Sequence, residues 1–263
     1  MYISDPTNNG RGALAFSPAP RQPSAAAPDE PNRLLRALPA GEYERLLREL
    51  KPVTLTLGQV LADPEEPVPY VYFPRTCVAS VVNRTDGHAV EVGTIGNEGM
   101  VGLSAFLDAD ALPAETVIQV AGDALRMPAA AFRALVAEGV ATEPALNRLL
   151  RRYTHAYLAQ VAQTAACNRL HELERRCARW LLMTRDRVEG DVLPLTQEFL
   201  AYMLGSRRAG VTVACGALQR SGLIRYRRGR ITVLDREGLE AAACPCYGVV
   251  RAYTERTLGS AVG

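Results

Sequence analysis

The chain has 263 residues, of which 48% are hydrophobic, and this is enough to build one large domain or two modest domains with real cores. No run of about 18 apolar residues occurs, and the first residues lack the charged-then-apolar pattern of a signal peptide, so we exclude a membrane-spanning protein and expect a cytoplasmic one. The net charge is only +2, and heavy use of Ala, Arg, Gly and Pro, with Lys51 as the only lysine, is typical of a GC-rich bacterial genome.

The first residues, 1–31, are rich in proline, serine, alanine, asparagine and glycine and show no apolar periodicity, so we expect them to be disordered. After them, leucines recur at helical spacing in two groups that Pro39 and Gly41 separate. This pattern predicts two short helices.

Between Val53 and Pro128 the apolar period changes to two, in short runs such as YVYFP, CVASVVN and HAVEVGTIG. Turn residues separate the runs, and Asp86-Gly87 is a hairpin signal between two of them. Several short strands at this spacing predict a small barrel or a double-sheet jelly roll.

A short helix is predicted in AAAFRALVAEG, and a long helix begins near Thr142, with Pro144 in its first turn. This long helix has about 25 residues and is roughly 38 Å long, which is more than a small barrel can cover. Its apolar and aromatic residues form one stripe, which would lie either on the strand domain of the same chain or on a second copy of the helix. We favour a dimer seam. The seam residues are Leu146, Leu150, Tyr153, Tyr157 and Val161.

A further helix is predicted in RLHELERRCARWLLMTRDRV, with Trp180, the only tryptophan, in the core. Two short helices joined by a tight turn follow, and they predict a helix-turn-helix. The first begins at an N-cap at Thr196, and the second runs from about Arg207 to Ser221. The alternation of LIRYRRGRITVLD around Arg228-Gly229 then predicts a β-hairpin wing.

Positive charge is concentrated on this module. From Thr196 to Arg236, eight arginines oppose Glu198 and Asp235, a formal charge of +6 within a chain of +2, which leaves −4 for the other residues. Such a confined positive field is typical of a protein that binds a polyanion, although an arginine-rich solvated surface is the alternative. Duplex DNA is favoured over RNA, whose major groove is too narrow for a helix.

The outward face of the second helix would enter the major groove of DNA, where arginine binds guanine and apolar groups contact the thymine methyl. We expect Arg208, Ala209, Thr212 and Val213 to read bases. Phosphate contacts around them would position the module without reading sequence. The expected phosphate-binding residues are Thr196, Ser206, Arg207, Arg220, Arg225, Arg227, Arg228 and Arg230.

In its order of parts the chain resembles the Crp/Fnr family of bacterial transcription regulators over about residues 33–240. The stretch LTQEFLAYMLGSRRAGVTVACGALQRSGLIRYRRGRITVLD is close to that family's DNA-binding signature, and GNEGMVGLSAFL looks like its β-roll segment around the ligand pocket. The resemblance implies a homodimer that binds a near-palindromic DNA site, with RNA polymerase as a further candidate partner.

The sequence thus predicts an α+β fold with an N-terminal double-stranded β-roll of jelly-roll type, a long dimerisation helix and a C-terminal winged helix-turn-helix. The expected parts are a disordered segment 1–31, a sensor-like β-roll 32–142, a dimerisation helix 143–167, a DNA-binding domain 168–240 and a C-terminal tail 241–263.

The ligand pocket departs from that of the cyclic-nucleotide-binding members, which hold the ribose with a Glu and the cyclic phosphate with an Arg-Ser pair. Here the turn reads Gly99, Met100, Val101, Gly102, with Leu103 at the Glu position, and Glu115 and Thr116 stand at the Arg-Ser position. A carboxylate about 4 Å from a phosphate costs about 1 to 4 kcal/mol. We therefore expect a degenerate pocket, no cyclic AMP binding and no cofactor, with the effector left open.

The recognition helix departs as well, because Ala209 and Val213 stand where many family members carry Glu and Arg. We therefore expect the DNA site to differ from the family's best-known one.

Alternative functions rest on weaker patterns. No cysteine precedes Cys77, as an N-terminal iron–sulfur site would require, and we expect His88 to face solvent and Cys77 to lie in a core strand, although a haem or redox sensor remains an alternative. A ligand-free scaffold whose roll contacts another protein is a second alternative.

An enzyme is not expected. The acids Glu98, Asp108, Asp110 and Glu115 cluster in the sequence, but no nucleophile elbow, HExxH, GxGxxG or P-loop accompanies them. We expect these acids to line loops of the roll.

The six cysteines show no CxxC pair and no Cys/His grouping at zinc spacing, so we expect no metal site. In a reducing cytoplasm such residues are usually small buried hydrophobes, with Cys244 and Cys246 the pair whose role stays open.

Overall fold

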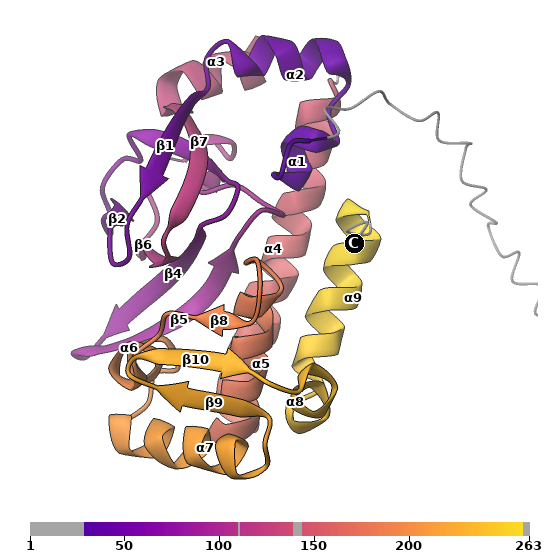
Figure 1. Ribbon diagram of the computed structural model, residues 1–263. Helices are drawn as coiled ribbons and strands as arrows, with labels where there is room; N and C mark the ends of the chain where they lie inside the picture. The colour runs from indigo at the N-terminus through magenta and orange to yellow at the C-terminus, as the bar shows by residue number, and fades with distance from the viewer. Residues whose placement is uncertain (1–28, 110, 139–143, 260–263) are drawn as a thin grey trace, which may run out of the picture.

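The computed structural model describes residues 29–109, 111–138 and 144–259, so the disorder expected for 1–31 falls almost wholly outside the described residues. Figure 1 shows a β-roll at one end, a smaller helical module at the other, and the long helix α4 (Ala145–Leu170) beside both. The predicted α+β class, with its roll, long helix and winged helix-turn-helix, is confirmed. Among the described helices, none is both long and apolar enough to cross a membrane.

The roll is built from short antiparallel strands, which are β1 (Lys51–Leu55), β2 (Val60–Ala62), β3 (Tyr70–Pro74), β4 (Val78–Thr85), β5 (His88–Ile95), β6 (Glu115–Val120) and β7 (Gly122–Pro128). They form two sheets, with strand orders β1-β7-β3 and β2-β6-β4-β5. Buried side chains of both sheets, among them Leu55 and Ile118, pack into one cluster, which also contains Cys77; this cysteine is buried as expected but lies just before β4 rather than within a strand. The double-sheet roll is therefore as the period-two pattern predicted, and Asp86 and Gly87 make the predicted hairpin turn with positive φ.

Three short helices pack with α4 against β3 and β7: α1 (Arg33–Arg36), α2 (Ala40–Leu47) and α3 (Ala129–Glu138). Asn32 caps α1, since its side-chain oxygen accepts from the backbone N–H groups of Leu34 and Leu35. The side-chain amide of Asn32 also donates to the carbonyl groups of Pro74 and Gly99, both at 2.9 Å. This one buried side chain therefore fixes the start of the fold on the roll.

The dimer seam predicted for the long helix α4 is wrong for its central residues. Leu150 and Tyr153 are buried in the core of their own chain, and the Tyr153 hydroxyl donates to the Met100 carbonyl at 3.1 Å. Leu146 and Tyr157 are half-buried and pack on the same cluster. The predicted stripe thus covers the roll of its own chain, because the roll exposes an apolar surface along most of the helix. Of the predicted seam, only the half-buried Val161 lies outside that cluster.

The C-terminal module contains α5 (Leu173–Arg185), β8 (Val192–Leu193), α6 (Gln197–Met203), α7 (Arg208–Arg220), β9 (Ile224–Arg227) and β10 (Arg230–Val233). Its strands form one antiparallel sheet in the order β8-β10-β9, so the predicted wing gains a strand. Trp180 is buried in the core, as predicted.

Residues after the wing were predicted only as a tail, but they fold into α8 (Arg236–Ala242) and α9 (Cys246–Leu258). Figure 1 shows α9 lying alongside α4, and the ring of Tyr253 on α9 contacts the ring of His155 on α4. The C-terminal helix therefore covers one side of α4.

Candidate DNA-binding surface

The second helix of the helix-turn-helix, α7, separates an apolar face from an outward face at helical spacing. Val211, Ala214, Cys215 and Leu218 are buried in the module. The predicted base-reading residues lie on the other side and are all exposed: Arg208, Ala209, Thr212 and Val213. Val213 is 69% exposed, an apolar side chain that its own chain leaves uncovered.

Hydrogen bonds fix α7 against the preceding helix α6. Thr196 caps α6, because its hydroxyl accepts from the backbone N–H of Phe199 at 3.1 Å. The Thr212 hydroxyl donates to the side-chain oxygen of Gln197 at 2.7 Å, or alternatively to the Arg208 carbonyl at 3.0 Å. The outward face of α7 is therefore held in one orientation before any ligand binds.

The wing hairpin turns at Arg228 and Gly229, whose φ angles of 49° and 73° are both in the left-handed region that a tight two-residue hairpin loop requires. Gln219, near the end of α7, accepts from the backbone N–H of Tyr226 in β9 at 2.7 Å. This bond links the wing to the helix it flanks.

The predicted phosphate-binding residues surround α7. All are exposed except Ser206, which is half-buried. Within the described parts of the chain, no hydrogen bond or ion pair engages the guanidinium groups of Arg207, Arg208, Arg225, Arg227, Arg228 and Arg230. Acids in the described part of the chain therefore do not neutralise these charges, and they can act on an external polyanion.

Two glycines of the roll lie close to tyrosine rings of α4, and one of them, Gly99, belongs to the predicted ligand pocket. Gly102 has φ 90° and precedes the buried Leu103. A Cβ at Gly99 would overlap the ring of Tyr153, and a Cβ at Gly93 would overlap the ring of Tyr157. Burial raises the pKa of both tyrosine hydroxyls.

Glu115 lies in β6 and points to the junction between the roll and the helix-turn-helix. It pairs with Arg84 at 3.2 Å and accepts from the hydroxyl of Tyr202, on α6, at 3.3 Å. Arg84 also stacks over the ring of Tyr202, 5.4 Å from its centre. The neighbouring Thr116 is buried. The pair predicted to mark a degenerate phosphate site therefore belongs partly to the contact between the two domains.

The acids considered as an enzyme site are engaged separately. Glu98 pairs with Arg187 at 2.8 Å, whereas Glu115 pairs with Arg84. Asp108 lies at a turn with φ 54°, and Asp110 lies outside the described residues.

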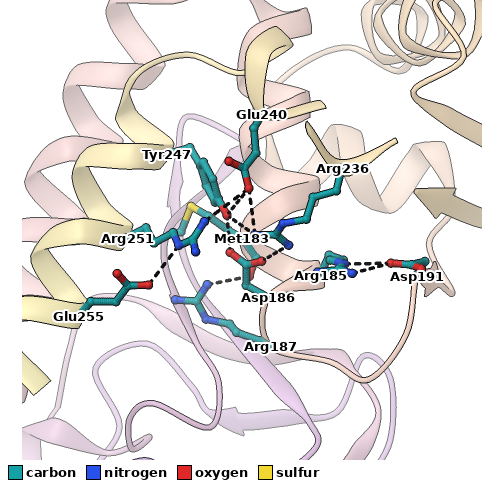
Figure 2. A network of polar contacts seen from close by, with 10 residues as sticks. All are labelled: Met183, Arg185, Asp186, Arg187, Asp191, Arg236, Glu240, Tyr247, Arg251 and Glu255. Atoms are coloured by element: carbon teal, nitrogen blue, oxygen red, sulfur yellow. Dashed lines mark hydrogen bonds and ion pairs between the residues drawn. The ribbon is translucent and has the colours of Figure 1, made fainter. Parts of the chain in front are cut away.

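A polar network joins α5, α8 and α9, and the sequence patterns did not predict it. Figure 2 shows Asp186 at its centre, where it accepts from Arg236 at 2.6 Å and from the hydroxyl of Tyr247 at 2.7 Å. Arg251 continues it to Glu255 at 3.1 Å. These residues line a cleft of about 420 Å³. Their separation in the sequence hides this network, and no local pattern would have revealed it.

Comparisons with known proteins agree with this architecture. A family model described as a cyclic nucleotide-binding domain matches residues 52–138, and one described as a Crp-like helix-turn-helix domain matches residues 175–242. No curated protein matches the chain.

Solved structures share the fold at low sequence identity. A CRP-family transcriptional regulator from Thermus thermophilus is 20% identical with a TM-score of 0.58, covering 73% of this chain and 96% of its own. A putative regulator of the crp/fnr family from Eubacterium rectale is 18% identical with a TM-score of 0.61, covering 80% and 96%. FixK2 from Bradyrhizobium japonicum is 16% identical with a TM-score of 0.61, covering 74% and 98%.

A cyclic nucleotide-binding roll followed by a helix-turn-helix with an exposed basic face defines a class of two-domain transcription regulators, which are not enzymes. The chain belongs to the Crp/Fnr family of these regulators.

Proposed function

We propose that this protein is a homodimeric transcription regulator that binds a specific, near-palindromic DNA sequence and does so without cyclic AMP. The observation that carries the proposal is the outward face of α7, where Arg208, Ala209, Thr212 and Val213 are exposed between arginines that have no acidic partner among the described residues. A helix with this face fits the major groove, and the surrounding guanidinium groups suit the phosphates on either side.

Dimerisation is supported by a second face of α4. Tyr153 faces the roll and His155 faces α9, which leaves a face with Leu158, Ala162 and Ala165 exposed. These residues are spaced by four and three, as in a helix–helix seam, and the small alanines allow close approach. Leu158 is 59% exposed, so a partner helix on this face would bury apolar surface and gain stability from it. We place the seam on this face, with Val161 at its edge.

Independence from cyclic AMP is supported by the region that the family resemblance identifies as the nucleotide pocket. Leu103 is buried and has no group that can bind a ribose hydroxyl, and the rings of Tyr153 and Tyr157 lie against the turn and strand of the pocket. Glu115 would bring a negative charge near a cyclic phosphate.

The tyrosine rings against this pocket also favour a ligand-free roll over a haem sensor as the second candidate function. Burial raises the pKa of the Cys77 thiol to about 11, which disfavours the thiolate that would bind iron, and His88 is exposed at a hairpin.

Selection of bound fragments from random-sequence DNA, followed by titration of the selected duplex, tests the proposal. We expect a two-fold symmetric consensus, binding that is orders of magnitude tighter than to unrelated DNA, and no effect of added cyclic AMP. Binding without any enriched sequence, even at low ionic strength, would contradict the proposal.

A further inference from the structure

Three cysteines and one histidine from distant parts of the sequence meet beside the hinge between α4 and α5. Cys167 and His171 lie one helical turn apart at the end of α4, and Cys244 and Cys246 flank Pro245 at the start of α9, whose first residue is Cys246. Their sulfur and ring nitrogen atoms all lie within 4.8 Å of one another. Cys167 Sγ and Cys244 Sγ are 3.4 Å apart, and Cys246 Sγ is 3.5 Å from His171 Nδ1.

We propose that these four residues bind a single zinc ion, or a similar thiophilic divalent metal ion, in a closed tetrahedral site. Three thiolates and one imidazole are a common ligand set of structural zinc sites. Bonds of about 2.0 to 2.3 Å around a tetrahedral ion place its ligand atoms roughly 3.3 to 3.8 Å apart. The Cys167–Cys244 and Cys246–His171 separations of 3.4 and 3.5 Å match this spacing, and the other ligand pairs lie within 4.8 Å, so small side-chain movements close the site around an ion. An iron–sulfur cluster would need ligands spread around several metal atoms.

The burial of the cysteines supports a metal site over a hydrophobic role. Cys167, Cys244 and Cys246 are at most 2% exposed, and they form a cluster of their own rather than part of a larger apolar core. A core of three thiols alone gives little packing, since each is small. Metal binding explains why three sulfur atoms converge.

Neighbouring polar groups suit a metal thiolate centre. The side-chain amide of Gln163 donates to Cys246 Sγ at 3.0 Å, as an outer-shell group that orients a ligand would. Arg179 is 5% exposed, and within the described residues the Nε of Arg179 and that of Arg176 have no hydrogen-bond partner. Three thiolates and a neutral imidazole around a divalent ion leave one negative charge, which the buried Arg179 and the half-buried Arg176 can balance.

The position suggests what the metal does. The ion would join the end of α4, where the chain is about to enter α5, to the start of α9. It would thereby fix the C-terminal helix α9 on α4, beside the DNA-binding module. Because the ion binds only the folded arrangement, it stabilises that arrangement. This role is independent of the proposed DNA site.

The test uses the full chain, purified under reducing conditions after growth with added zinc. We expect about one zinc ion per chain by elemental analysis, and cobalt(II) exchanged into the site should give the visible absorption of tetrahedral thiolate coordination. Removal of the ion with a strong chelator should lower Tm, and added zinc should restore it.

Variants localise the ion. His171 is half-buried, so His171→Ala should fold, and we expect it to weaken metal binding at least about tenfold, as Cys246→Ser should. Cys77→Ser, at a buried cysteine of the roll, is the matched control and should keep the ion.

Four results would overturn the proposal. The first is a protein that holds no stoichiometric metal after growth with zinc, and the second is a Cys167–Cys244 disulfide in freshly purified protein. The third is an iron–sulfur absorption spectrum, which would refute the single-ion site. Equal metal loss from the Cys77 control would also refute the assignment of these four ligands.

Discussion

At the scale of single residues, the DNA-binding surface separates side chains that read bases from side chains that bind phosphates. Arg208 lies at the start of α7, on its outward face, whereas Arg228 lies at the tip of the wing. Both are exposed and carry the same charge, so they can be compared directly.

Arg208→Ala should weaken binding to the selected DNA by about 1 to 3 kcal/mol and weaken binding to unrelated DNA much less. Fluorescence anisotropy with both duplexes measures this difference. Arg45→Ala, which removes the same charge from α2 in the roll, is the control and should leave both affinities unchanged. Equal losses on the two duplexes would rule out base reading by Arg208.

Arg228 supplies the contrasting case. Its φ of 49° is poorly tolerated by alanine but accepted by asparagine, so Arg228→Asn removes the charge with less strain. We expect weaker binding to all sequences alike and a salt dependence reduced by about one phosphate contact. A loss confined to the selected duplex would make Arg228 a base-reading residue.

Glu91 shows how one buried side chain links the two domains. It is 6% exposed in β5, and its carboxyl accepts from the indole N–H of Trp180 on α5 at 3.0 Å. The Ser80 hydroxyl lies 2.6 Å from both Glu91 and the side-chain oxygen of Gln119, but it has one proton to donate. A protonated Glu91 that donates to Ser80 satisfies all three groups. Burial raises the pKa of Glu91, which also favours the protonated form, whereas the hydrogen bonds that its carboxyl accepts lower the pKa and are outweighed.

A pH dependence follows from this raised pKa. The folded chain keeps the Glu91 proton to higher pH than the unfolded chain, so this contribution to stability is full at acid pH and is lost as pH rises through the folded-state pKa. Glu91→Gln mimics the neutral acid at every pH, so the variant should not lose this stability as pH rises. Relative to the parent, its Tm should rise by a few degrees between about pH 5 and pH 8, since about 1 kcal/mol shifts Tm by about 2 to 4 °C in a chain of this size.

Thermal melts of the parent, Glu91→Gln and the exposed control Glu189→Gln at both pH values measure this effect. The control should follow the parent. A relative Tm for Glu91→Gln that falls with rising pH would show that Glu91 is ionised in the fold.

At the scale of elements, α4 has three uses along one helix. One face packs on the roll through Leu150 and Tyr153, a second face contacts α9 at His155, and a third presents Leu158 and Ala162 to solvent. The apolar stripe in the sequence marked the first face. The seam proposed here uses the third, which has fewer large residues and so gives a weaker sequence signal.

Leu158→Asp should break the dimer, because it places a charge at the centre of an apolar seam. Sedimentation velocity should show a fall to the monomer mass. Val249→Asp makes the same change at an exposed apolar residue of α9 and should leave the dimer intact. An unchanged profile for Leu158→Asp, or a monomer from both variants, would remove the seam from this face.

At the scale of the whole molecule, the two domains are in direct contact as well as being joined by α4. The roll contacts the helix-turn-helix at Arg84, Glu115 and Tyr202, and through the bond between Glu91 and Trp180. Polar contacts therefore connect the roll directly to α6 and to α5, in addition to the covalent connection through α4.

Cyclic AMP should leave the whole molecule unaffected. Thermal melts at rising nucleotide concentration should show a constant Tm, because a ligand that binds only the folded state must raise it. Calorimetric titration gives an independent check. A saturable rise in Tm, or tighter binding to the selected DNA with cyclic AMP, would contradict the degenerate pocket.

The sequence by itself determined the features that depend on local periodicity and charge. Period-two runs gave the strands of the roll, helical spacing placed Val211 and Leu218 inside and Val213 outside α7, and arginine clustering marked the wing. The tertiary structure alone decided which face of α4 is left for a partner, that the C-terminal residues fold back as α9, and that Cys167 meets Cys244. Local patterns depend on neighbours a few residues apart, whereas these three features depend on groups far apart in sequence that only the folded chain brings together.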